Sequence, residues 1–312
     1  MNLHNVVWFG DPGIDDTIAV IYAILSKEVN FLASCGSSGN TSARQSSLNF
    51  SFIFEEMGLD YSVFRGLPRK RRLVQLLKEV HGEDGIGGTY ERKSLRKISS
   101  VMKMPEFLSG ARSFVLVNTG PFSDLAMLCE KFPSLFKSKV ERIVAMGGSR
   151  CGGNVTPSAE FNIYSDPISA QRIINSGIPV ILVPLDITSR VTLTTEDFAW
   201  LQDKRFPFAG KLFKMITYYQ KFHESYEGFS GFTAHDPVAL LALLKPELFR
   251  FTDVPVQVEK KRGITFGHTA MDFRYRSRNS THNQISVATD IDVERARDVL
   301  VNTIRRGFDL LD

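Results

Sequence analysis

The sequence predicts an α/β fold: a single domain whose mostly parallel central sheet carries helices on both faces. Three observations predict it. Short β-branched apolar runs recur along the chain, patterns typical of helices separate them, and no internal repeat or long Pro/Gly/Ser-rich linker interrupts the 312 residues. We therefore expect residues 1–312 to form one domain.

The apolar runs are too short and too continuous for surface strands and are typical of strands buried on both faces. The expected strands are Val6–Phe9, Phe31–Cys35, Phe114–Val117, Arg142–Met146 and Val180–Val183. Patterns typical of helices accompany them at Ile18–Leu25, Ser42–Met57, Asp124–Phe132 and Pro167–Asn175, and Val293–Leu311 is expected to be a closing amphipathic helix.

Composition excludes several classes of protein. Hydrophobic residues make up 43% and charged residues 23% of the chain, as in globular proteins, and the net charge of +4 is too small and too scattered for a nucleic-acid groove. Three cysteines without a C-x-x-C pair argue against a disulfide framework or structural zinc. No signal peptide and no membrane-spanning run are visible, so a cytoplasmic location is expected.

In open α/β sheets, ligands bind at the carboxyl ends of the strands, so the segments after the predicted strands are candidate site walls. These segments are Gly10–Asp16, Gly36–Asn40, Asn118–Phe122 and Gly147–Asn162, and a further polar cluster, Thr233–Asp236, opens a helix.

The first of these segments is acidic. Asp11, Asp15 and Asp16 crowd around a Pro12-Gly13 turn that can fold Asp11 back toward Asp16. Like charges this close need a cation or hydrogen bonds to compensate them, and carboxylates without nearby Cys or His favour calcium or magnesium over zinc. The alternative is that Asp15 or Asp16 simply caps the following helix.

Seven motifs, in order from about residue 6 to residue 240, resemble those of the inosine–uridine preferring nucleoside hydrolases. They are Asp11-Pro12-Gly13-Ile14-Asp15-Asp16, Gly39-Asn40, His81-Gly82-Glu83-Asp84-Gly85, Asn118-Thr119-Gly120-Pro121, the block from Met146-Gly147-Gly148 through Asn154–Asn162 to Asp166-Pro167, Leu185-Asp186-Ile187-Thr188, and His235-Asp236-Pro237. One such motif is weak evidence, whereas seven in order are strong.

The resemblance implies a Rossmann-like nucleoside hydrolase fold, a nucleoside substrate and a homodimer or homotetramer. It implies a calcium ion held by Asp11, Asp16, Asp236 and the backbone carbonyl of Thr119, with ribose hydroxyls completing the shell. It further implies hydrogen bonds to the sugar from Asp15, Asn40, Asn154, Glu160 and Asn162, apolar contact from Met146 and Phe161, and a place for His81 and Tyr226 at the base end of the pocket.

These residue types suit N-glycosidic cleavage. The bond breaks through an oxocarbenium-like state, whose positive charge carboxylates stabilise. A water bound to the metal has a lowered pKa, and Asp11 is its expected general base. His235 is expected to assist the departing base, because histidine titrates near neutral pH.

Each candidate also has a structural interpretation. Asn154 and Asn162 could bind local backbone in turns, His235 could cap a helix, and Met146 and Phe161 could be core. A group of aromatic residues, Tyr218, Tyr219, Phe222 and Tyr226, has the spacing of one helix face, typical of packing, although a lid that stacks on the base remains an alternative.

One position departs from the family. Its acidic loop usually begins Asp-Thr-Asp or Asp-Cys-Asp, and here these positions are Phe9-Gly10-Asp11. The lost carboxylate leaves a catalytically weak or inactive nucleoside-binding homologue as the alternative to an active hydrolase. An aspartyl phosphatase is a third hypothesis, which the missing first Asp of an Asp-x-Asp pair argues against.

Overall fold

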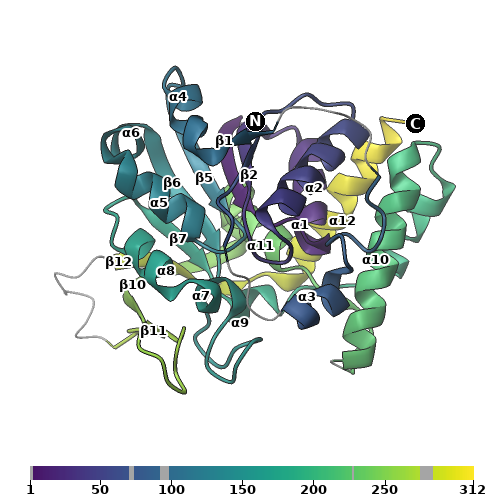
Figure 1. The fold of residues 1–312 in the computed structure, drawn as a ribbon. Helices are drawn as coiled ribbons and strands as arrows, with labels where there is room; N and C mark the ends of the chain where they lie inside the picture. Colours follow the sequence, from purple (N-terminus) through teal and green to yellow (C-terminus); the bar gives the residue numbers. More distant parts are fainter. Residues whose placement is uncertain (1–2, 70–73, 92–97, 227, 275–283) are drawn as a thin grey trace.

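The computed structural model describes residues 3–69, 74–91, 98–226, 228–274 and 284–312. Within these ranges a ten-stranded sheet has the order β11-β10-β12-β7-β6-β5-β1-β2-β3-β4 (Figure 1). The strands are β1 (His4–Gly10), β2 (Val29–Gly36), β3 (Val63–Arg65), β4 (Ser99–Ser100), β5 (Phe114–Asn118), β6 (Val140–Met146), β7 (Val180–Val183), β10 (Phe249–Val258), β11 (Thr269–Met271) and β12 (Gln284–Ile291).

The sheet is parallel from β4 through β1 to β12, and only β10 pairs antiparallel, with β12 on one side and β11 on the other. The five predicted strands are confirmed as β1, β2, β5, β6 and β7. The prediction missed β3, β4 and β11, which are short, and β10 and β12, whose partly exposed residues make no continuous apolar run.

Helices cover both faces of the sheet, as predicted (Figure 1). One face carries α1 (Ile14–Ser26), α2 (Ala43–Glu56), α10 (Pro207–Tyr226), α11 (His235–Leu244) and α12 (Val293–Asp309). The other carries α4 (Met104–Leu108), α5 (Ser123–Lys131), α6 (Pro133–Lys139) and α8 (Pro167–Ile174). The shorter helices α3 (Val74–His81), α7 (Phe161–Ser165) and α9 (Leu185–Thr188) lie in connections, and a two-residue ladder joins β8 (Thr192–Leu193) to β9 (Phe232–Thr233).

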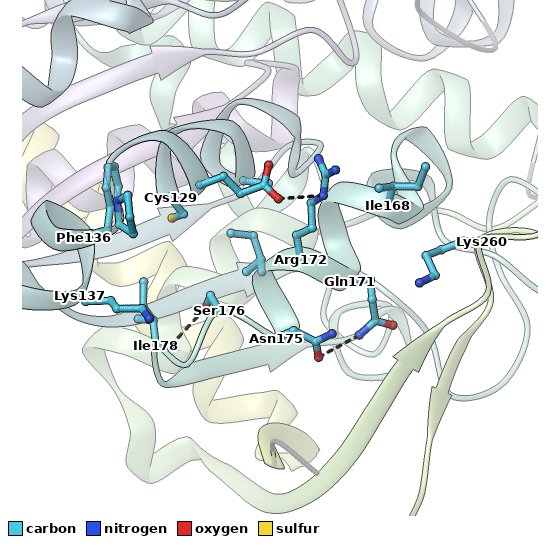
Figure 2. Close-up of a pocket in the computed structure, with 14 residues that line it drawn as sticks. Cys129, Phe136, Lys137, Ile168, Gln171, Arg172, Asn175, Ser176, Ile178 and Lys260 are labelled. Atoms are coloured by element: carbon cyan, nitrogen blue, oxygen red, sulfur yellow. Dashed lines mark hydrogen bonds and ion pairs between the residues drawn. The ribbon is translucent and has the colours of Figure 1, made fainter.

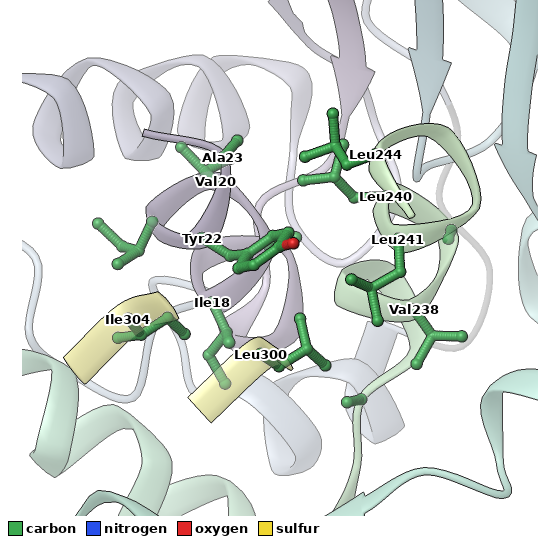
Figure 3. Close-up of a cluster of buried hydrophobic side chains, with 14 of the residues drawn as sticks. Ile18, Val20, Tyr22, Ala23, Val238, Leu240, Leu241, Leu244, Leu300 and Ile304 are labelled. Atoms are coloured by element: carbon green, nitrogen blue, oxygen red, sulfur yellow. The ribbon is translucent and has the colours of Figure 1, made fainter. Parts of the chain in front are cut away.

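The pleat of β1 divides its side chains between two apolar clusters. Val6 and Trp8 belong to the cluster under α1, and Val7 and Phe9 belong to the cluster on the opposite face. On the first face, α1 packs between α11 and α12, and Tyr22 lies among Leu and Ile side chains from both (Figure 3). This packing fixes the first turn of α1 at the carboxyl end of β1.

The start of α1 corrects an expectation. The helix begins at Ile14 rather than near Ile18, so Asp15 and Asp16 lie inside its first turn and Gly13 is the N-cap. The capping alternative holds only for Asp16, whose Oδ2 accepts a hydrogen bond from the backbone N–H of the N-cap residue Gly13 at 3.0 Å. None of the helices in the described ranges combines the length and apolarity that crossing a bilayer requires.

Candidate active site

A cavity of about 310 Å³ opens at the carboxyl ends of the central strands. It brings together segments that are far apart in the sequence: the loops after β1, β2, β5 and β6, the end of α3, the second half of α10 and the start of α11. Its lining includes thirteen of the fourteen predicted site residues: Asp11, Asp15, Asn40, His81, Thr119, Met146, Asn154, Glu160, Phe161, Asn162, Tyr226, His235 and Asp236. The fourteenth, Asp16, is fully buried against this group.

Carboxylates form the floor of the cavity. Asp15, Asp16 and Asp236 each offer an oxygen, and these oxygens all lie within 4.8 Å of one another. Asp11 adjoins them, and its charge interacts with those of Asp16 and Asp236. The group differs from the expected set of ligands in two respects: Asp15, assigned to the sugar, lies within it, and Asp11, an expected ligand, is not part of it. The buried aspartates could bind a metal ion.

Burial governs the charge state of these groups. It raises the pKa of Asp15 to about 8 and that of Asp16 to about 6, and it raises the pKa values of Asp11 and Asp236 well above the ordinary value, with repulsion between the aspartates adding to the effect. Among the described residues, neither Lys nor Arg lines the cavity. A bound cation would therefore compensate the negative charge of these aspartates. Their carboxylate oxygens are the type of ligand that a hard cation prefers.

Thr119 joins this group from the end of β5. Its hydroxyl donates to Asp16 Oδ1 at 2.6 Å and accepts from the indole nitrogen of Trp8 at 2.9 Å. Its carbonyl accepts from Asn162 Nδ2 at 2.9 Å. A carbonyl oxygen has two lone pairs, so this hydrogen bond leaves one free for a cation.

Asn40 and Glu160 hold the walls beside the aspartates. The backbone N–H of Asn40 donates to Asp11 Oδ2 at 2.5 Å. Glu160 accepts from the backbone of Gly148 at 2.8 Å, of Asn162 at 2.7 Å and of Ile163 at 3.1 Å. Burial outweighs these three hydrogen bonds and raises the pKa of Glu160 to about 7. Its carboxylate thus connects the loop that follows β6 to the start of α7.

For Asn154 and Met146 the structural interpretation applies alongside the functional one, whereas Phe161 is only partly buried and belongs to neither apolar cluster. Asn154 Oδ1 accepts from the backbone of Phe161 at 3.0 Å, which is the local contact expected of a turn residue. Met146 is buried in the core, with its sulfur 3.4 Å from Asn162 Nδ2. Asn154, Met146 and Phe161 nevertheless all line the cavity.

His81 is held as a neutral ring. Its Nδ1 accepts from the backbone N–H of Ile14 at 3.2 Å, and the ring stacks on Tyr219 at 5.3 Å between centroids. Burial, together with repulsion by His223 and His235, lowers the pKa of His81 to about 3. Because Nδ1 is an acceptor, the neutral ring carries its proton on Nε2, which can donate a hydrogen bond.

His235 has a hydroxyl partner at each ring nitrogen. Thr188 Oγ1 lies 2.8 Å from Nδ1 and Thr233 Oγ1 lies 2.7 Å from Nε2. Proton transfer from His235 to a departing base therefore requires one of these hydrogen bonds to be exchanged. His235 is the first residue of α11 and Ala234 is its N-cap, so the ring does not cap the helix as the structural interpretation expected.

The cavity lining also includes residues that the sequence did not single out as a site: Leu77, Val80, Val155 and His223. His223 is one helical turn beyond Tyr219 on α10, and the two rings meet edge to face at 4.5 Å. Histidine on an aromatic helix face was the available signal. Phe222 and Tyr226 stack at 4.5 Å and line the cavity, whereas the hydroxyl of Tyr218 donates to α3.

Phe9 does not enter the site. Its side chain is fully buried in the apolar cluster opposite α1, on the other face of the sheet from Trp8. Its backbone carbonyl accepts from the N–H of Thr119 at 2.9 Å, as any residue could provide at that position. The apolar ring thus extends the core beneath the site instead of occupying space within it.

A second cavity, of about 430 Å³, lies between α5, α6 and α8 (Figure 2). Its charged residues include Arg172 and Glu130, which pair at 2.9 Å. It shares no lining residue with the first cavity and lacks a group of carboxylates like the one there. The aspartate-lined cavity is therefore the candidate active site.

Comparison with known proteins agrees with this geometry. The sequence profile described as "Inosine-uridine preferring nucleoside hydrolase" matches residues 6–298. The pyrimidine-specific ribonucleoside hydrolase RihA of Escherichia coli O17:K52:H18 (strain UMN026 / ExPEC) is 32% identical over 305 residues, covering 95% of this chain and 96% of the relative.

Two solved structures share the fold along nearly their whole length. The purine-preferring ribonucleoside hydrolase from Gardnerella vaginalis is 28% identical with a TM-score of 0.89, covering 98% of this chain and 99% of that one. The plant nucleoside hydrolase PpNRh1 is 27% identical with a TM-score of 0.86, covering 96% and 98%.

Fold, cavity and acidic group together define a nucleoside N-ribohydrolase. The chain belongs to the inosine-uridine preferring nucleoside hydrolase family.

Proposed function

We propose that the protein is a calcium-dependent hydrolase that cleaves ribonucleosides to ribose and free base. One observation carries the choice of metal: Asp11, Asp15, Asp16 and Asp236 are all buried at one cavity floor beside the Thr119 carbonyl. An all-oxygen donor set with several carboxylates is the ligand type that calcium prefers, and it offers no sulfur or nitrogen to a softer metal.

A bound calcium ion would offset the carboxylate charge, chelate vicinal ribose hydroxyls and lower the pKa of a coordinated water. Around it, Asp11, Asp16, Asp236 and the Thr119 carbonyl are the proposed ligands. Asp15, Asn40, Asn154, Glu160 and Asn162 bind the sugar hydroxyls, while Met146 and Phe161 contact the ring, since all of these line the cavity.

Asp11 is the proposed general base. Its Oδ2 is held by the Asn40 N–H, and the neighbouring aspartates and burial raise its pKa, which strengthens it as a proton acceptor. It takes a proton from the attacking water as the N-glycosidic bond breaks. The bonding electrons leave with the base, and the ribosyl cation forms among carboxylates that stabilise it.

The base leaves toward the histidine-lined end of the cavity. His235 is the proposed proton donor, and the Nε2–H of neutral His81 can hydrogen-bond the base in either protonation state of His235. Tyr219, Phe222 and Tyr226 supply aromatic surface at the same end. Together these residues favour a planar heterocycle as the leaving group.

The alternative of a catalytically weak binder rested on Phe9. The Phe9 side chain packs in the apolar cluster opposite α1 and does not line the cavity, which supports an active enzyme.

Calcium-loaded protein should release free ribose from members of a panel of purine and pyrimidine nucleosides, both of which are needed because the relatives' names differ in base preference. A reducing-sugar assay on the whole panel that stays at background refutes the hydrolase. Calorimetry that detects nucleoside binding without turnover would identify the binder instead, and release of phosphate from phosphomonoesters would identify a phosphatase.

Assembly and location remain predictions. We expect a homodimer or homotetramer, which light scattering on the purified chain checks directly, and a cytoplasmic location, which fractionation of the source cells checks.

A further inference from the structure

Trp8 connects the apolar core to the aspartates. Its indole N–H donates to Thr119 Oγ1 at 2.9 Å, and Thr119 Oγ1 in turn donates to Asp16 Oδ1 at 2.6 Å. An indole nitrogen can only donate and an ionised carboxylate can only accept. The direction of both hydrogen bonds is therefore determined by chemistry, and the hydroxyl proton of Thr119 must point at Asp16.

Core packing fixes the starting point of this chain of hydrogen bonds. Trp8 is fully buried and stacks on Phe31 with ring centroids 5.8 Å apart and planes at 15°. Phe31 is itself held by Phe54 at 5.3 Å and by Tyr61 at 5.2 Å. The indole has no room to rotate, so the position of its N–H is set by side chains that never touch the cavity.

The other end of the chain is equally constrained. The second oxygen of Asp16 accepts from the backbone N–H of Gly13 at 3.0 Å. With one oxygen held by Thr119 and the other by Gly13, the plane of the Asp16 carboxylate is defined before any cation arrives. Preorganised ligands bind more tightly because less conformational freedom is lost on binding.

We propose that Trp8 is a positioning residue for the metal site, acting through the Thr119 hydroxyl to orient the Asp16 carboxylate toward the cation. This inference rests on the proposed metal site. Thr119 is also tied to β1 by its backbone N–H, which donates to Phe9 O at 2.9 Å. Two adjacent residues of β1 thus hold Thr119 from its side chain and from its backbone.

The test is calcium titration of metal-free protein by calorimetry, with terbium luminescence as a second readout. Trp8→Phe removes the donor and keeps an aromatic ring in the core. We expect its calcium affinity to fall by about 10-fold or more, the effect typical of losing a residue that orients a metal ligand. Terbium emission excited through tryptophan should be lost as well, because Trp8 lies two hydrogen bonds from Asp16.

Controls separate positioning from packing. Trp200→Phe removes the other tryptophan, whose indole donates to Asp197 O outside the site, and should retain the wild-type affinity and terbium signal. Thr119→Val breaks both hydrogen bonds without disturbing the aromatic stack, and Thr119→Ser restores a hydroxyl. Thr119→Val should match Trp8→Phe, the double variant should be no worse than either single variant, and Thr119→Ser should recover most of the affinity.

The results of these titrations distinguish the positioning role of Trp8 from the existence of the metal site. Wild-type affinity in Trp8→Phe overturns the positioning role alone, as does a double variant whose losses simply add. A wild-type chain that binds neither calcium nor terbium overturns the metal site and this inference together. Loss of affinity in Trp8→Phe and Thr119→Val, with unchanged affinity in Trp200→Phe, establishes the connection.

Discussion

The backbone N–H of Asn40 donates a 2.5 Å hydrogen bond to the carboxylate of Asp11, joining the loops that follow two neighbouring parallel strands. The contact depends on Gly39, because a Cβ built there would lie 1.8 Å from Asp11 Oδ2 and 2.9 Å from Pro121 Cδ. The position of the proposed general base is therefore determined by a residue without a side chain.

Gly39→Ala should displace Asp11 and lower kcat/KM by about 100-fold or more, the scale of loss that a misplacement of about 1 Å can cause. Steady-state kinetics with calcium present provide the measurement. Gly210→Ala is the matched control, since a Cβ at Gly210 meets no atom within 4 Å. It should keep wild-type kinetics and gain stability slightly in its helix. Equal kinetics for both variants would show that Gly39 does not constrain Asp11.

The metal-free protein should lose stability as the pH rises. The pKa of Asp15 is raised to about 8 and that of Asp16 to about 6, from 3.8, so the folded state keeps protons that the unfolded chain releases. Their protonated forms favour folding at low pH, and this contribution declines as the pH rises from about 4 to about 8. Thermal unfolding of metal-stripped protein across that range should show a falling Tm.

Excess calcium should flatten that decline, because a ligand that binds only the folded state stabilises it most where the aspartates are ionised. Asp15→Asn removes one titrating group and should also reduce the slope in metal-free protein. A metal-free Tm that rises between about pH 5 and about pH 8 would contradict the assigned direction of the pKa shifts.

His235→Ala should impair hydrolysis of purine nucleosides more than that of nitrophenyl ribosides, whose leaving groups depart without a proton. General-acid assistance typically contributes about 100-fold or more, so the ratio of the two losses should reach at least about 10-fold. Steady-state kcat/KM on both substrates supplies the comparison. Equal losses would remove His235 from the acid role and leave it as a structural partner of Thr188 and Thr233.

Tyr22→Phe should not destabilise the protein. The Tyr22 hydroxyl is fully buried among α1, α11 and α12 and has no hydrogen-bond partner (Figure 3). Removing a buried polar group without a partner relieves a desolvation cost of about 1–3 kcal/mol, so the free energy of unfolding should stay level or increase. Urea denaturation measures it, and a decrease of more than about 1 kcal/mol would indicate that the hydroxyl is satisfied in solution.

Much of the architecture followed from local patterns. Continuous apolar runs identified β1, β2, β5, β6 and β7, because strands buried on both faces exclude polar residues from every position. The rule that ligands bind at the carboxyl ends of such strands then located the cavity walls, including Asp11 and Asn40. Strands such as β10 escaped prediction because an antiparallel, partly exposed strand need not be uniformly apolar.

The sequence alone thus determined the five strands β1, β2, β5, β6 and β7, the acidic loop after β1 and the family resemblance. The tertiary structure decided that Asp236 meets Asp15 and Asp16 across more than two hundred residues, that Phe9 faces away from them and that Trp8 faces toward Thr119. The physical reason is that periodicity specifies which face of a strand or helix is buried, whereas the partner that a buried side chain meets depends on how distant elements pack across the sheet.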